Sequence, residues 1–224
     1  MASSENDFEI QILGYDYWEE PEGRAGEAVL LHTSRGDIRT LLHHEAETPA
    51  AIVWVWGARG GFDGPANGIY GVLAEELKPR VASLRVDYRE PNVLHECVLD
   101  TLAGVSFLKA AGCTRVLLVG HSLGGAVVIS AAPLSDLVIG VVALSSQTYG
   151  AASAASVAPR PLLLVHGAED SRLSYQCSEQ IYEWAQDPKE LVIYPDAGHG
   201  LIECAPQLHD LLTRWIVDKL EVPA

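Results

Sequence analysis

Six short runs of the sequence are almost continuously apolar, with glycine, proline or polar residues on either side. They span residues 51–56, 81–86, 115–119, 138–144, 161–165 and 190–194. Strands that are buried on both faces have this pattern, as in a parallel sheet that helices cover on each side. The pattern therefore predicts six central strands of such a sheet.

Between these runs, apolar residues recur at intervals of three and four, as on one face of a helix. The helices expected on this basis span residues 69–77, 94–108, 175–185 and 208–220. Pro79 and Pro188 follow two of them, and Pro206 lies near the start of the last, where its missing N–H costs nothing. Strands that alternate with helices predict right-handed βαβ units and the α/β class.

The first 45 residues have a different pattern. Residues 8–13, 28–32 and 39–44 are short and alternate between apolar and polar positions, and a turn signal lies at 35–37. We expect antiparallel edge strands within 1–45, ahead of a core that spans 51–220. The chain shows no linker, and its 224 residues suit one domain, so we expect a single domain over 1–224.

Charge and composition limit the partners and the location that we expect for the protein. The chain has 30 acidic and 15 basic side chains, a formal net charge of −15. A surface of that sign repels nucleic-acid phosphates and acidic lipid headgroups, so we expect neither as a partner. No apolar run reaches the length of a membrane helix, and residues 1–7 hold neither a basic residue nor an apolar stretch, so we expect a cytoplasmic protein. Four cysteines, none in C-x-x-C spacing, are expected as free, largely buried thiols: Cys97, Cys113, Cys177 and Cys204.

The most informative segment reads G-H-S-L-G-G at 120–125. An apolar run leads directly into this G-x-S-x-G motif, and a pattern of small helical residues follows it. A reversal from strand to helix within one residue forces Ser122 to a strained positive φ and leaves room only for glycine at 120 and 124. The turn predicts Ser122 as a nucleophile at a helix N-terminus. A glycine-rich turn with an incidental serine is the alternative; a phosphate-binding loop lacks its usual Lys-Ser/Thr.

A serine hydroxyl needs a base that takes its proton and an acid that orients the base. His199 is the expected base, because it lies in a glycine-containing loop just after the last apolar run. Asp170 is the expected acid, with Glu169 as the second choice, because both follow the run at 161–165. The order Ser122, Asp170, His199 is the chain order associated with this nucleophile turn.

The remaining histidines are assigned structural roles. We expect His121 to point away from Ser122 and to pack, and His166 to support the loop of the acid. His43 and His44, with Glu45, could imitate a metal site, but adjacent residues of a strand point to opposite faces, so we expect no metal.

Two backbone N–H groups are expected to form an oxyanion hole. The N–H of Leu123 follows the nucleophile, and the second donor should come from the glycine-containing loop at 57–63, as the N–H of Ala58 or alternatively of Arg59. The expected substrate-binding residues lie beside the catalytic loops: Trp56, Arg59, Phe62, Tyr149 and Leu201. Arg59 could meet a substrate carboxylate or be a solvated loop charge.

Together these motifs resemble the α/β-hydrolase family over residues 52–220. The resemblance depends on G-H-S-L-G-G at 120–125, H-G-A-E-D at 166–170, G-H at 198–199 and W-G at 56–57, where members often have His-Gly. It implies a mostly parallel sheet of about eight strands with helices on both faces, Ser122 as nucleophile, Asp170 as acid, His199 as base, and no metal or organic cofactor.

The small size of the chain limits the resemblance to members without a cap domain. Many members insert a helical cap domain where this chain has only residues 145–160, so we expect no cap. The compact chain is similar to dienelactone-hydrolase-like and other small capless esterases. Dienelactone hydrolases generally have a cysteine nucleophile, however, so the serine at 122 argues against that specific activity.

The leading hypothesis is therefore a serine hydrolase that cleaves small carboxylic esters through an acyl-enzyme intermediate. A thioesterase, an amidase or a peptidase needs the same groups and stays open as an alternative. A non-catalytic ligand-binding protein with this fold is the alternative from another class. The sequence leaves the oligomeric state and the acyl-chain preference open.

Overall fold

The strands of the protein form a single sheet of nine, in the order β1-β2-β3-β5-β4-β6-β7-β8-β9. The computed structural model describes residues 9–222. The antiparallel part is β1 (Ile12–Tyr17), β2 (Glu27–Thr33) and β3 (Ile38–His43), and β3 also pairs antiparallel with β5. The parallel part is β4 (Ala50–Val55), β5 (Ala82–Asp87), β6 (Arg115–His121), β7 (Val138–Leu144), β8 (Leu162–Gly167) and β9 (Lys189–Tyr194). The mostly parallel α/β sheet is confirmed, with nine strands where the resemblance implied about eight.

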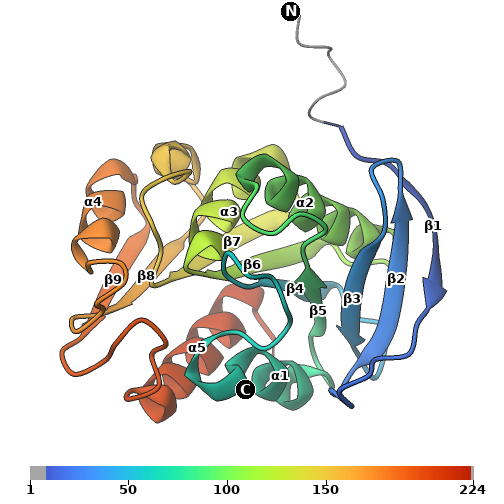
Figure 1. The fold of residues 1–224 in the computed structure, drawn as a ribbon, viewed down its shortest axis with the longest axis horizontal. Coiled ribbons are helices and arrows are strands. Elements are labelled where there is room, and N and C mark those ends of the chain that lie inside the picture. Colours follow the sequence, from blue (N-terminus) through green and yellow to red (C-terminus); the bar gives the residue numbers. More distant parts are fainter. Residues whose placement is uncertain (1–8, 223–224) are drawn as a thin grey trace, which may run out of the picture.

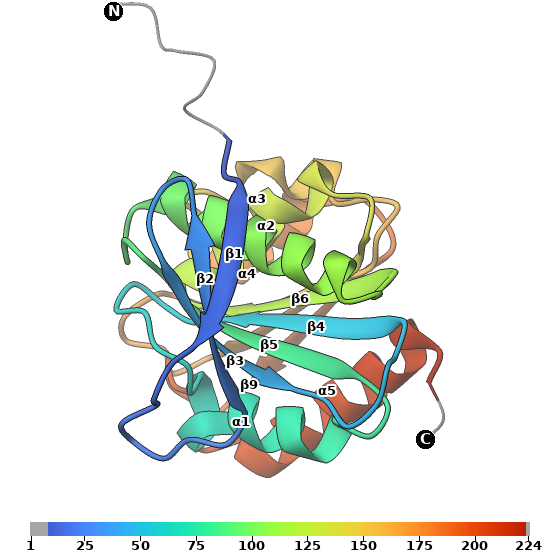
Figure 2. The same ribbon diagram turned by 90° about the vertical axis from the view of Figure 1, so that its right-hand side faces the viewer.

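Helices cover both faces of the sheet, so the molecule has three layers (Figures 1 and 2). The helices on one face are α2 (Leu94–Ala110), α3 (Leu123–Ala131) and α4 (Gln176–Trp184); those on the other are α1 (Pro65–Leu77) and α5 (Ala205–Leu220). Between β7 and β8 the chain holds only a short 3₁₀ turn at Ala152–Ser156, so the described residues contain no cap domain there. None of the helices within residues 9–222 combines the length and the hydropathy of a membrane-spanning segment.

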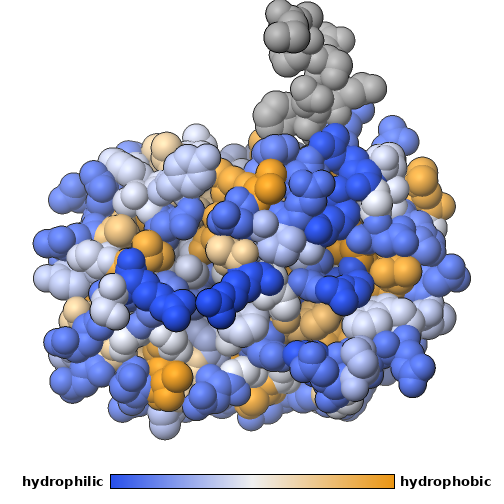
Figure 3. Space-filling view, in the orientation of Figure 1, coloured by the Kyte–Doolittle hydropathy of each residue, from blue (hydrophilic) through white to orange (hydrophobic). Residues whose placement is uncertain are grey.

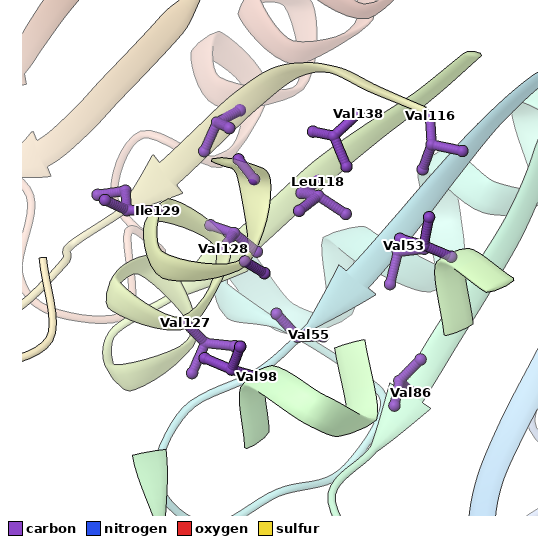
Figure 4. Packing of buried hydrophobic residues seen from close by; sticks show 14 of the residues in the cluster. Val53, Val55, Val86, Val98, Val116, Leu118, Val127, Val128, Ile129 and Val138 are labelled. Atoms are coloured by element: carbon purple, nitrogen blue, oxygen red, sulfur yellow. The ribbon is translucent and has the colours of Figure 1, made fainter. Parts of the chain in front are cut away.

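Alternation along the central strands explains why their sequences are continuously apolar. In β4, Val53 and Val55 face the core beneath α2 and α3, whereas Ile52 and Trp54 face the core beneath α1 and α5. Figure 4 shows the first of these cores, where Val55 lies close to Val98 of α2 and Val127 of α3, and Val53 lies further along the same strand. Each fully buried apolar side chain stabilises the fold by about 1.5–3 kcal/mol relative to an exposed one.

The first strand is the largest departure from the sequence-based expectation. Residues 8–13 were expected as a strand, but β1 spans Ile12–Tyr17, and Phe8 lies outside the described residues. The strand is defined by its pairing with β2, from Ile12 opposite Thr33 to Tyr17 opposite Val29, and several of its large side chains stay exposed. Burial therefore has little influence on the residue pattern of β1, and apolar alternation predicted the bounds of this strand poorly.

The exposed surface is mainly hydrophilic on the face shown in Figure 3, where hydrophobic side chains occur in small separate groups. The loops that matter for chemistry follow the carboxyl ends of β4, β6, β8 and β9. Strands β4 and β6 are neighbours, as are β8 and β9, and all four are parallel, so these loops emerge at the same edge of the sheet. This edge holds the candidate site.

Candidate active site

The nucleophile turn connects β6 to α3 through a single strained residue. Ser122 has φ 60° and ψ −118°, in the positive-φ region that the sequence predicted. A Cβ at Gly120 would overlap the Gly124 carbonyl, and a Cβ at Gly124 would overlap the carbonyl oxygen of Trp56. Only glycine therefore fits on either side of the serine, and the turn presents its hydroxyl at the N-terminus of α3.

Ser122, His199 and Asp170 meet in one hydrogen-bonded chain. His199 Nε2 lies 3.2 Å from Ser122 Oγ, and His199 Nδ1 lies 2.7 Å from Asp170 Oδ2. An ionised carboxylate only accepts hydrogen bonds, so Nδ1–H donates to Asp170 and leaves Nε2 to accept from the serine hydroxyl. The three residues follow β6, β8 and β9, and the sheet brings them together although 77 positions separate the serine from the histidine.

Asp170 is a buried carboxylate whose oxygens are all engaged. Its Oδ1 accepts from the N–H groups of Arg172 at 2.8 Å and Leu173 at 2.9 Å. Burial alone would raise the pKa of the Asp170 carboxyl, but the hydrogen bonds from Leu173, His199 and Arg172 outweigh it and hold that pKa below its usual value. Glu169, the second choice as acid, is exposed, and its N–H donates to Ala197 O at 3.0 Å.

A second histidine supports the acid from behind. His166 Nε2 lies 3.1 Å from Asp170 Oδ2 and 3.0 Å from Leu173 O, and its Nδ1 lies 2.7 Å from Ser178 Oγ. Because the carboxylate and the carbonyl only accept, Nε2 carries the proton and Nδ1 accepts from the Ser178 hydroxyl. Burial lowers the pKa of His166, which favours this neutral form. The expectation that His166 supports the loop of the acid is confirmed.

His121 packs as expected, and it packs against the base. Its Nε2–H donates to the carbonyl oxygen of His199 at 2.8 Å, and the two rings lie 4.8 Å apart between centroids. Burial lowers the pKa of His121 to about 4, so the imidazole is neutral around pH 7. No local pattern predicts this contact, because the partner lies 78 positions away.

The loop that carries the base is attached to the rest of the molecule at four consecutive residues, 197–200. Ala197 O accepts from the Glu169 N–H at 3.0 Å, and the Gly198 N–H donates to the Glu203 carboxylate at 3.0 Å. His199 O accepts from His121, as described above, and Gly200 O accepts from the Ala66 N–H of α1 at 2.7 Å. The backbone around the imidazole is therefore fixed by several different elements.

The loop after β4 passes directly beside the serine. A Cβ added to Gly57 would lie 3.4 Å from Ser122 Cβ and 3.7 Å from Ser122 Oγ. Within residues 9–222, neither the N–H of Ala58 nor that of Leu123 donates to a protein acceptor. Both N–H groups are thus free to donate to an oxygen bound next to Ser122.

A cavity of about 1000 Å³ opens beside Ser122 and His199. Three residues of the loop after β4 that the sequence pointed to, Trp56, Ala58 and Arg59, line it. The sequence had not singled out several other lining residues: Arg24, Asp63, Val72, Arg85, Arg172 and Ile202. Arg24 lies in the β1–β2 connection, Val72 in α1 and Arg85 in β5, and the other three lie in loops. No sequence motif marks any of the six.

Three residues predicted to bind substrate do not line this cavity. Phe62 is buried, where its ring stacks on Trp18 at 6.2 Å between centroids. Leu201 has φ 52°, which turns its side chain into the core beneath α1 and α5, so that its neighbours line the cavity instead. Tyr149 is 73% exposed on the connection between β7 and β8.

The other candidate sites have structural explanations. His43 points inward, where it contacts Glu75 and Arg85, and His44 points outward, as expected for neighbours on a strand. No group of three potential metal ligands occurs within the part of the chain that the structure describes. The four cysteines are free thiols: Cys97, Cys113 and Cys204 are buried and Cys177 is half-buried. Burial raises the pKa of the Cys97 thiol to about 12.

Comparison with solved structures shows the fold. Est1E from Butyrivibrio proteoclasticus superimposes with a TM-score of 0.72 at 19% identity, over 88% of this chain and 100% of that one. A dienelactone hydrolase from Anabaena variabilis has a TM-score of 0.75 at 20% identity, over 86% of this chain and 97% of the other. An alpha-beta serine hydrolase homologue from Coxiella burnetii has a TM-score of 0.68 at 18% identity, over 84% and 96%.

Comparison with curated sequences finds matches to the uncharacterized protein YfhR. YfhR of Escherichia coli O157:H7 is 32% identical over an alignment of 108 residues, with a coverage of 38% for each chain. YfhR of Salmonella typhimurium is 29% identical over 193 residues, which are 85% of this chain and 55% of the relative. The chain thus matches about half or less of the length of these relatives.

A family model assigns the chain to a family. The model of the dienelactone hydrolase family matches residues 58–210. The matched region begins in the loop after β4 and ends within α5, so it contains Ser122, Asp170 and His199. This match covers more than half of the chain, and the protein is therefore a member of the dienelactone hydrolase family of α/β hydrolases.

Proposed function

We propose that the protein is a serine hydrolase that cleaves carboxylic esters of small molecules through an acyl-enzyme intermediate. The observation that carries the proposal is the continuous chain from Ser122 Oγ through His199 to Asp170, with distances of 3.2 and 2.7 Å. A hydroxyl, an imidazole and a buried carboxylate in this order are the triad of serine hydrolases. Ser122 and His199 also line the cavity, where a substrate can reach them.

In the acylation step, Ser122 Oγ attacks the ester carbonyl carbon while its proton moves to His199 Nε2. The bond from that carbon to the alcohol oxygen then breaks, and Nε2 returns the proton to the departing oxygen. Asp170 stays ionised and stabilises the transient imidazolium through Nδ1–H, and its hydrogen bonds from backbone N–H groups favour this charged state. The products are a free alcohol and an acyl ester of Ser122.

Negative charge develops on the carbonyl oxygen during the attack, and two backbone donors are available for it. The N–H of Leu123 lies next to the nucleophile, and the N–H of Ala58 lies in the loop that passes beside it. Each such donor contributes about 3–4 kcal/mol to transition-state stabilisation. The N–H of Arg59 is the alternative to that of Ala58.

Deacylation repeats the same steps with water. Nε2 takes a proton from the water as the water oxygen attacks the acyl carbon, and it returns the proton to Ser122 Oγ as the acyl bond breaks. The carboxylic acid leaves, and the enzyme regains its starting state. The absence of a cap between β7 and β8 is consistent with entry of small, soluble esters from solvent.

The proposal is tested with a panel of p-nitrophenyl esters of increasing acyl length, and with a fluorophosphonate probe that labels activated serines. We expect turnover and labelling in the wild-type protein, and loss of both in Ser122→Ala and His199→Ala, with folds intact by circular dichroism. Thioesters and anilides in the same panel distinguish thioesterase and amidase activity. A wild-type protein that is as inert as Ser122→Ala towards every substrate and the probe would favour a ligand-binding role instead.

A further inference from the structure

The Asp170 carboxylate binds a second histidine besides the expected base. His199 Nδ1 lies 2.7 Å from Asp170 Oδ2, and His166 Nε2 lies 3.1 Å from the same oxygen atom. Ser178 Oγ lies 2.7 Å from His166 Nδ1, just as Ser122 Oγ lies 3.2 Å from His199 Nε2. Two serine–histidine pairs therefore share one carboxylate oxygen, and the proposed hydrolysis uses only one of them.

The second pair lies out of reach of a substrate. His166 belongs to β8 and Ser178 to α4, and both residues are fully buried. Ser122 and His199, in contrast, line the cavity. The buried pair can therefore influence the reaction only through the carboxylate that both histidines contact.

The carboxylate of Asp170 accepts four hydrogen bonds. Its Oδ1 accepts from the N–H groups of Arg172 and Leu173, and its Oδ2 accepts from His199 and His166. A carboxylate offers about four lone-pair directions, so all of them are used. Each N–H group directs the positive end of its dipole at the oxygen and offsets part of the negative charge. The donor from His166 thus reduces the negative charge that faces His199.

Ser178 determines which nitrogen of His166 donates. Its hydroxyl donates to Nδ1, so the ring proton of the neutral imidazole lies on Nε2, where it reaches Asp170 Oδ2 and also Leu173 O at 3.0 Å. A hydrogen bond received at Nδ1 polarises the ring and makes Nε2–H a stronger donor. The serine therefore strengthens the donation that the carboxylate receives.

We propose that His166 and Ser178 are positioning residues that limit the proton affinity of His199 through the shared oxygen of Asp170. A carboxylate that keeps its full negative charge stabilises the imidazolium form of the base more strongly. An imidazolium cannot take the proton of the serine, so the site would then lose activity at a higher pH. The buried pair extends activity towards acidic pH. This inference rests on the proposed ester hydrolysis at Ser122.

Other ionisable groups surround the base, and they stay unchanged in the variants described below. Within residues 9–222, only the two histidines donate a hydrogen bond to Asp170 Oδ2. The ionisable residues that contact the base or its loop are His121 of β6, Glu169 and Arg172 after β8, and Asp196 and Glu203 after β9. The cavity wall adds Arg24, Arg59, Asp63 and Arg85.

Two substitutions of His166 separate its two hydrogen bonds. His166→Asn places an amide oxygen near the former position of Nδ1, so it still accepts from Ser178 but no longer donates to Asp170. His166→Gln places an amide N–H near the former position of Nε2, so it keeps the donor to Asp170. The two variants thus differ in the one contact that the proposal invokes.

The readout is kcat/KM on a p-nitrophenyl ester from pH 5 to pH 9. In His166→Asn we expect the midpoint of the acid limb to rise by roughly 0.5–1 pH unit, which lowers kcat/KM on that limb roughly 3- to 10-fold relative to its plateau. The midpoint of His166→Gln should equal that of the wild type.

Ser178→Ala tests the chain from its far end and keeps both histidines. It should raise the midpoint by a smaller amount in the same direction, because His166 loses the donor that polarises its ring. Ser130→Ala is the matched control, since it also removes a helix hydroxyl, one that donates to Gly150 O. Its midpoint should equal that of the wild type.

A spectroscopic titration separates this proposal from the proposed function. Ser122→Ala is labelled with ¹⁵N-histidine, and the ring nitrogens of His199 are followed by NMR across the same pH range. Adding His166→Asn should raise the titration midpoint of His199, and adding His166→Gln should not. If no ester is hydrolysed but this midpoint moves as expected, ester hydrolysis fails and the positioning role stands. Midpoints that neither His166→Asn nor Ser178→Ala moves, or that His166→Asn and His166→Gln move equally, overturn the proposal.

Discussion

The neutral imidazole of His121 makes the fold sensitive to acid. Burial lowers the pKa of His121 from an ordinary 6.5 to about 4. Below pH 6.5 the unfolded chain takes up a proton at this position, whereas the folded chain does so only near pH 4, so acid favours unfolding. A pKa difference of one corresponds to about 1.4 kcal/mol, and this residue therefore lowers the free energy of unfolding by about 3 kcal/mol between pH 7 and pH 4.

His121→Gln tests this estimate because glutamine cannot take up the proton but can still present an N–H to His199 O. We expect the loss of unfolding free energy between pH 7 and pH 4.5 to be roughly 2–3 kcal/mol smaller in the variant than in the wild type. Urea denaturation followed by tryptophan fluorescence, at several pH values across this range, measures it. The contributions of His43 and His166, whose pKa values are also lowered by burial, are common to both proteins.

The control for this experiment is His44→Gln, because His44 is exposed just after β3. It should follow the wild-type pH dependence. The reasoning is refuted if the wild type and His121→Gln lose stability in parallel as the pH falls. That result would mean that the pKa of His121 is the same in the folded and the unfolded protein.

Three further predictions concern the turn, the acid and the thiols. Gly124→Ala places a methyl group onto the carbonyl oxygen of Trp56, so we expect a loss of more than about 3 kcal/mol of stability, or no folded protein, in thermal unfolding; a normal melting temperature would contradict the steric argument. Asp170→Asn should lower kcat on p-nitrophenyl esters by roughly 10⁴-fold, since the amide favours the wrong tautomer of the base; a loss below tenfold would point to another acid. With a thiol reagent at pH 8, the half-buried Cys177 should react first, and Cys97, whose pKa is raised by burial, should react only after denaturation; equal rates for both would contradict the burial of Cys97.

The sequence predicts the centre of the sheet well because two-sided burial leaves a continuous apolar pattern. The strand expected at 138–144 has the observed bounds of β7, and Val138–Leu144 has neighbours on both faces. The pattern fails at β1, where backbone pairing with β2 defines the strand and large side chains remain exposed. Edge strands need little burial, so their apolar residues carry little information on their bounds.

The residues of the candidate triad could be identified from local motifs, whereas most residues of the cavity wall could not. The steric demand for glycine on both sides of Ser122 leaves a signal in the sequence itself. Arg85 lies inside a strand whose other residues are buried, and only the tertiary structure shows that its side chain reaches the cavity. Leu201 was assigned to the pocket because it lies beside the loop of His199, but a positive φ reverses its direction.

The attachment of the loop at 197–200 to four different groups has a consequence for turnover. Because Glu169, Glu203, His121 and α1 each hold one residue of that loop, the imidazole has little freedom left to lose when a substrate arrives. If His199 is the proton acceptor proposed above, the entropy of orienting it is lost once, when the chain folds, and not again in every cycle. Heating should then abolish turnover and tertiary structure over the same temperature interval, since this loop cannot melt ahead of the elements that restrain it.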